Sequence, residues 1–99
     1  MKLVYLPSAR KHLREAMEYL HREAGPQVVA RVRSGILDEA ERLKEFPRGG
    51  QEEEYLSHLG KGHRRIVQGN YKVIYRIEGE TIYVTDIFDT RRNPAKMSG

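Results

Sequence analysis

Apolar residues recur at helical spacing along two stretches in the first half of the chain. A first helix is expected over residues 8–24, with Ser8 as its N-terminal cap. Its apolar side comprises Leu13, Ala16 or Met17, and Leu20. A second helix is expected from Pro26 to Glu45, with an apolar stripe of Val29, Val32, Ile36, Ala40 and Leu43. Because Gly25 and Pro26 suit the junction between two helices, the pattern predicts an antiparallel helical hairpin.

The apolar positions follow a period of two at the start and in the second half of the chain. Residues 2–6, KLVYL, predict a strand that Pro7 ends. Three further strands are expected over residues 63–67, 71–77 and 81–88, joined by turns. Alternation turns Tyr71, Val73, Tyr75 and Ile77 toward the helices and Lys72, Ile74 and Arg76 away from them. The predicted fold is α+β, in the order β-αα-βββ, with the helical hairpin on one face of a small antiparallel sheet.

Length and composition narrow the class of protein. A chain of 99 residues is expected to form one domain, residues 1–99. The absence of cysteine excludes a disulfide scaffold and a cysteine-based zinc site. No apolar run reaches the roughly 20 residues that span a bilayer, and the N-terminal residues do not resemble a secretory signal. We therefore expect a cytoplasmic protein with no membrane partner.

Charge is distributed unevenly, although the net charge is only +4. Residues 60–77 contain no acid and five cations, namely Lys61, Arg64, Arg65, Lys72 and Arg76. An acidic run at residues 52–54 precedes them, and we interpret it as solvated. The basic segment favours a nucleic acid or an acidic protein as partner, and the alternative is an ordinary solvated surface.

Motifs that carry enzyme chemistry are mostly absent. Residues 60–62 are too short for a phosphate-binding loop, and no serine lies in a nucleophile motif. The histidines lack metal-ligand spacing and are expected on the surface: His12, His21, His58 and His63. The tyrosines fall largely at apolar positions, which favours core packing over base stacking. We therefore predict no metal and no cofactor.

One cationic constellation stands out on the predicted sheet. His63 and Arg65 share a face of one strand, and Lys72 and Arg76 share a face of the next. Arg91 and Arg92 follow the last strand and would close one end of this surface. Cations that repel one another do not assist folding, so we expect a bare, positively charged surface that binds an anion. The alternative is that these side chains only solvate the outer side of the sheet.

Several segments resemble the RelE/ParE superfamily of bacterial type II toxins, and the ParE branch most closely. They are the strand, helix and Gly-Pro hairpin at the N-terminus, LKEFP at residues 43–47, HRRIV at 63–67, GNYKVIYR at 69–76 and IFDTRRNP at 87–94. The resemblance implies a toxin that is neutralised by a cognate antitoxin, whose acidic C-terminal segment wraps around it. Candidate residues for binding the target or the antitoxin are His63, Arg64, Arg65, Lys72, Arg76, Arg91 and Arg92.

The two branches of the superfamily imply different activities. ParE-like toxins poison DNA gyrase and are not nucleases, whereas RelE-like toxins are enzymes that cleave messenger RNA on the ribosome. Residues that match the RelE catalytic set are His63, Arg65, Lys72 and Arg91. The tyrosine of that set is missing, with Met97 in its region, and Lys72 lacks the two-pronged grip of arginine on phosphate. The resemblance therefore favours a gyrase poison over a ribosome-dependent endonuclease, and a non-toxic binding module is the third alternative.

Overall fold

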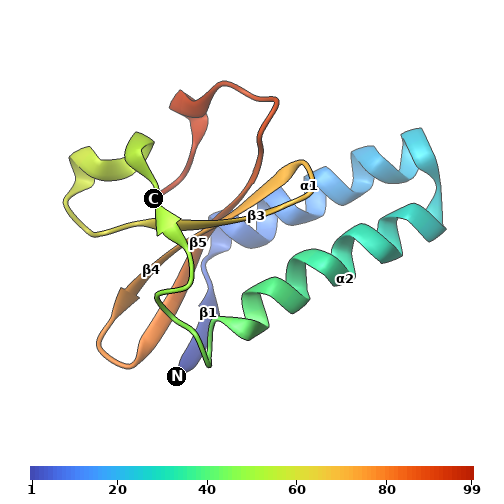
Figure 1. Cartoon of the computed structure of the whole chain (residues 1–99). Coiled ribbons are helices and arrows are strands. Elements are labelled where there is room, and N and C mark those ends of the chain that lie inside the picture. Colours follow the sequence, from blue (N-terminus) through green and yellow to red (C-terminus); the bar gives the residue numbers. More distant parts are fainter.

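Two helices lie on one side of a five-stranded sheet in the computed structural model, which describes residues 1–99 (Figure 1). The helices are α1 (Pro7–Ala24) and α2 (Pro26–Arg42), and the short 3-10 helices are η1 (Glu54–Leu59) and η2 (Pro94–Lys96). The strands are β1 (Lys2–Tyr5), β2 (Gln51–Glu52), β3 (Arg64–Gln68), β4 (Tyr71–Glu78) and β5 (Thr81–Asp89). The predicted α+β architecture, with the helical hairpin packed on a sheet, is confirmed.

The sheet has the strand order β1-β5-β4-β3-β2. Strands β3, β4 and β5 form the predicted antiparallel meander, and Gly69 and Gly79 adopt positive φ in its two turns. β1 adds to β5 in parallel, and the two-residue β2 adds to β3 at the other edge. These two edge strands extend the predicted meander to five strands.

Both helices begin and end close to the predicted positions, but for partly different reasons. α1 begins at Pro7, so Ser8 does not cap it. The Ser8 hydroxyl instead donates to the Thr85 carbonyl at 2.7 Å and ties α1 to β5. Proline suits the first helical position because it has no N–H group that would need a partner. The helix therefore begins at Pro7, one residue earlier than predicted. α2 ends at Arg42 rather than Glu45, because the following residues form tighter turns.

The main hydrophobic core lies between the helical hairpin and the sheet face that it covers, which we call the inner face. The predicted stripes of both helices contribute to it, together with alternate residues of β4 and β5. Its fully buried members include Ile36, Ala40, Val73, Tyr75, Ile82 and Val84. At Gly35 of α2 an added Cβ would lie 2.7 Å from the side-chain Nε2 of Gln68, so α2 packs closely against this side chain of β3.

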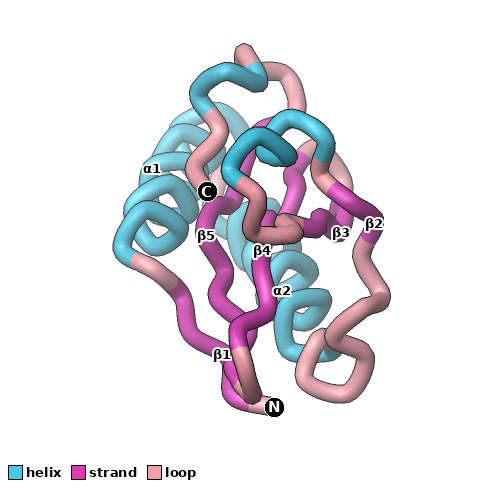
Figure 2. Tube along the Cα trace, turned by 90° about the vertical axis from the view of Figure 1, so that its left-hand side faces the viewer, coloured by secondary structure: helices cyan, strands magenta, loops and turns pink.

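The opposite face of the sheet, here the outer face, carries a second and smaller core of Leu56, Ile74, Phe88 and Met97. Leu56 comes from η1, and Met97 follows η2. Both short helices therefore lie on the side of the sheet away from α1 and α2 (Figure 2). The polar residues 49–62, to which the sequence assigned no structure, thus form part of a cover over the outer face.

Candidate functional site

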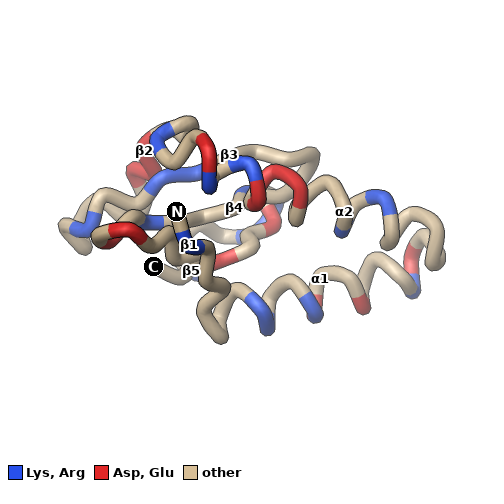
Figure 3. The backbone as a smooth tube through the Cα atoms, turned by 90° about the horizontal axis from the view of Figure 1, so that it is seen from below, with Lys and Arg blue, Asp and Glu red and all other residues tan.

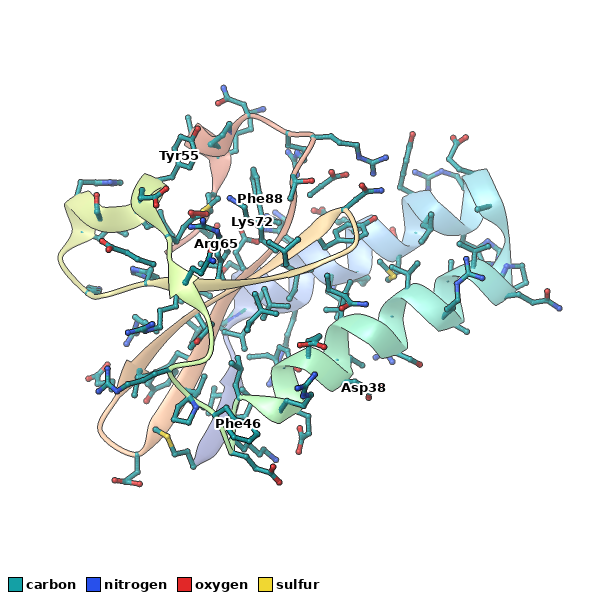
Figure 4. All side chains as sticks on the ribbon, viewed as in Figure 1. Asp38, Phe46, Tyr55, Arg65, Lys72 and Phe88 are labelled. Atoms are coloured by element: carbon teal, nitrogen blue, oxygen red, sulfur yellow. The ribbon has the colours of Figure 1, made fainter.

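Arg65 and Lys72 meet on the outer face, as the alternation of β3 and β4 predicted (Figure 4). The surface that they form is not bare. Lys72 Nζ lies 2.8 Å from Oε1 of Glu53, and Arg65 Nη1 lies 3.2 Å from Oε2 of the same carboxylate. The expectation of an unpaired positive surface was therefore wrong, because one buried carboxylate is shared by its two central cations.

Glu53 reaches this position because its backbone is held at the edge of the sheet. Its N–H donates to the His63 carbonyl at 2.9 Å, directly after the β2–β3 ladder. Arg65 further donates to the Glu52 carbonyl and, at 3.2 Å, to Oε1 of Gln51. The acidic run is therefore not uniformly solvated: Glu52 and Glu54 are exposed, whereas Glu53 retains 1% of its accessible surface.

His63 is buried rather than exposed, with 2% of its surface accessible. It lies one residue before β3, and neither ring nitrogen has a hydrogen-bond partner. An added Cβ on Gly99 would lie 3.1 Å from its Nε2, so the C-terminal segment packs directly against the ring. Burial lowers the pKa of His63, the Gly99 backbone opposes this shift, and the nearby Arg76 and Lys61 lower the pKa further. The surroundings therefore favour the neutral form of the ring.

The other histidines divide between burial and exposure. His12 is half-buried, and its Nδ1 lies 2.6 Å from the carboxylate of Asp86, which is fully buried. His21 and His58 are exposed, as expected. No three His, Asp or Glu side chains are placed together so that they would hold a metal ion.

Arg64 and Arg76 belong to the basic segment but do not join Arg65 and Lys72. Arg64 Nη1 donates to the Gly50 carbonyl at 2.7 Å, which holds the loop before β2. Arg76 pairs with Glu78 at 2.6 Å, and its guanidinium lies over the Tyr83 ring at 4.7 Å. Both side chains are engaged within the protein.

Arg91 and Arg92 follow β5 and remain largely accessible. Arg91 Nε and Nη2 lie 2.9 and 2.8 Å from the two carboxylate oxygens of Asp89. The hydrogen bonds from Arg91 lower the pKa of Asp89, and in return Asp89 raises the pKa of Arg91. The Arg91 side chain is 57% exposed in spite of this pair, and Arg92 is exposed as well.

An apolar groove runs between α1 and α2, and we call it the helical groove. Its volume is about 850 Å³, and its apolar lining comprises Tyr5, Leu13, Met17, Val29 and Leu37. Four arginines border it: Arg10, Arg14, Arg22 and Arg33. Figure 3 shows that Lys and Arg residues recur along both helices. This groove was not predicted from the sequence, although the arginines beside the apolar stripes were a visible signal for it.

The sequence comparison assigns the family. The family model of the ParE toxin of type II toxin–antitoxin systems, parDE, matches residues 3–94. This chain belongs to the ParE toxin family. A comparison with curated protein sequences finds no match.

A solved structure supports the ParE fold independently. It is described as a chromosomal ParDE TA system from P. aeruginosa, and its matching chain superposes with a TM-score of 0.73. The match covers 88% of this chain and 92% of that chain at 17% sequence identity. The likeness establishes the fold.

Two tyrosines of this ParE-family toxin are exposed. Tyr55 of η1 is 57% exposed, and its ring centre lies 5.8 Å from Lys72 Nζ. Tyr19 of α1 is 52% exposed. These two tyrosines depart from the expected core positions, whereas Tyr71 and Tyr75 are buried.

Neither helix is sufficiently long and apolar to cross a membrane.

Proposed function

We propose that this chain, as one domain over residues 1–99, is a cytoplasmic toxin that stops bacterial growth by poisoning DNA gyrase and that a cognate antitoxin neutralises it. The observation that carries the proposal is the ParE family match over residues 3–94. It agrees with the motifs in strands β3 to β5 and with the region after β5, on which the resemblance to the ParE branch rests.

The arrangement of the basic residues favours a gyrase poison over a nuclease. A general acid or base must reach the proton that it transfers, and His63 is 2% exposed beneath the C-terminal segment. Arg65 and Lys72 share Glu53, and Arg91 is paired with Asp89. The four residues that match the RelE catalytic set are thus either buried or paired with carboxylates.

The helical groove suits the antitoxin. It combines an apolar floor with four bordering arginines, of which Arg14 contacts an acid of the same helix, Glu18, at 4.0 Å. An acidic amphipathic helix would bury its apolar side in this groove and place carboxylates beside the arginines. We propose this contact as the main site of neutralisation.

The exposed cations after β5 are the proposed contacts to the target. Among the seven candidate residues, Arg91 and Arg92 keep the most accessible guanidinium groups. The other five are buried or half-buried. Arg91→Ala and Arg92→Ala should therefore weaken toxicity more than Arg64→Ala.

The decisive experiment is a supercoiling assay with purified gyrase. We expect the protein to inhibit supercoiling and to accumulate cleaved DNA, and we expect the antitoxin to reverse both effects. Unchanged supercoiling together with cleavage of messenger RNA on translating ribosomes would identify the RelE-like endonuclease instead. Normal growth after expression without the antitoxin would identify a non-toxic binding module.

A further inference from the structure

Two cations of the outer face bind one carboxylate in the way that proteins often bind a phosphate group. Lys72 Nζ contacts one oxygen of Glu53 at 2.8 Å, and Arg65 Nη1 contacts the other at 3.2 Å. Charge-assisted bonds from an ammonium and a guanidinium to two oxygens of one anionic group are a common mode of phosphate recognition. The site therefore has the donor set for phosphate, but an acid of the same chain fills it.

The acid and the cations come from different elements. Arg65 and Lys72 are neighbours on β3 and β4, whose ladder forms without any help from residue 53. Glu53 comes from the edge segment, where the β2 ladder is only two residues long and Leu56 provides an anchor in the small core. The backbone positions of Arg65 and Lys72 are therefore set by the β3–β4 ladder and not by the carboxylate.

Solvent reaches the cations more readily than it reaches the acid. The side chains of Arg65 and Lys72 are 19% and 18% exposed, whereas that of Glu53 is 1% exposed. The exposed ring of Tyr55 lies beside Lys72. A phosphate group approaching from solvent would thus meet the two cations, with an aromatic face next to them on which a nucleobase can stack.

We propose that Arg65 and Lys72 form a latent phosphate-binding site and that Glu53 keeps it closed by occupying it from within. The ligand class is a phosphate group, either free or within a single-stranded nucleic acid. Glu53 is thus the residue that decides whether this face of the protein binds phosphate. The inference concerns a face of the protein that the proposed gyrase activity does not use, so each can fail without the other.

The experiment compares Glu53→Gln with the control Glu54→Gln. The control removes the same charge from the neighbouring residue, whose side chain is exposed. Inorganic phosphate is titrated at constant ionic strength, and binding is followed by NMR shifts of the Arg65 and Lys72 amides. We expect the affinity of Glu53→Gln to exceed that of the unmodified protein at least about tenfold, because a unit charge a few ångströms away is removed. The affinity of Glu54→Gln should remain that of the unmodified protein.

Two further measurements test the proposal, and the second uses only the unmodified protein when Glu53→Gln does not fold. The gain in Glu53→Gln should disappear in the double variant Glu53→Gln/Lys72→Ala, and binding that persists there would overturn the proposal. In the unmodified protein, saturable phosphate shifts at Arg65 and Lys72 as strong as those of Glu53→Gln would also overturn it. Should Glu53→Gln fail to fold, saturable phosphate shifts of any strength at the Arg65 and Lys72 amides of the unmodified protein would overturn the proposal.

The source of the phosphate is decided with a short single-stranded RNA and Tyr55→Ala in the Glu53→Gln background. A loss of RNA affinity with unchanged affinity for inorganic phosphate identifies a nucleic acid as the ligand that the opened site prefers. Equal effects on both ligands identify the phosphate group alone. In either case the opened site binds phosphate, as proposed.

Discussion

The two faces of the sheet are stabilised in different ways. The inner face is covered by α1 and α2 through a core of apolar side chains and buried tyrosines. The outer face has a core of only four residues and, beside it, the buried acid Glu53 and the buried His63. Burial of apolar surface needs no specific partner, whereas a buried polar group needs one. The inner face therefore carries most of the stability, and the outer face holds buried groups that depend on specific partners.

The largest expected effect comes from opening the inner core. Ile36→Ala removes a fully buried side chain between α2 and the sheet, and it should lower the free energy of unfolding by about 2–5 kcal/mol. Chemical denaturation measures this value. Val67→Ala, at a side chain that is 58% exposed, is the control and should stay within about 0.5 kcal/mol of the unmodified protein.

The next largest effect is expected at the buried carboxylate of Glu53 on the outer face. Glu53→Gln leaves Arg65 and Lys72 without their shared carboxylate and should lower the free energy of unfolding by about 1–3 kcal/mol. Glu54→Gln should change it by less than about 0.5 kcal/mol. Equal unfolding midpoints of these two variants would mean that the outer face does not depend on the buried acid.

A smaller effect concerns the pH dependence that His63 imposes. Its folded-state pKa lies below the ordinary 6.5, so the unfolded chain binds more protons and stability falls as the pH drops below 6.5. The loss should level off once the pH is below the folded-state pKa. His63→Leu removes this titration, and its unfolding midpoint should fall less between pH 7 and pH 5. An equal fall in both proteins would assign the pH dependence to another group.

The smallest effect is expected at the ion pair between Arg91 and Asp89, at the end of β5. The Arg91 hydrogen bonds depress the pKa of Asp89 below 3.8, so their contribution exists above that pH and is lost as the pH falls through the folded-state pKa. Arg91→Ala should therefore lower the unfolding midpoint slightly at pH 6, and the difference should shrink as the pH falls below 3.8. A difference that does not shrink would show that the arginine acts through packing.

The features that depend on local pattern were predictable from the sequence. The apolar stripes of the helices, the turns at Gly69 and Gly79 and the alternation that places Arg65 and Lys72 on one face all follow from periods of 3.6 and two. The segments at residues 43–47, 63–67, 69–76 and 87–94 also pointed to the family that the sequence comparison then assigned. Periodicity states which side of an element is apolar, but it does not state what covers the other side.

Only the tertiary structure decided which charges remain free. Within the acidic run, Glu52, Glu53 and Glu54 are chemically alike, and the backbone bond to His63 turns only the middle one inward. The helical groove likewise depends on how far two separate helices diverge, and His63 is buried by a segment more than thirty residues later in the chain. Sequence patterns act over a few residues, whereas ion pairs and burial depend on contacts between distant segments, and for this reason the fold was predictable and the state of the site was not.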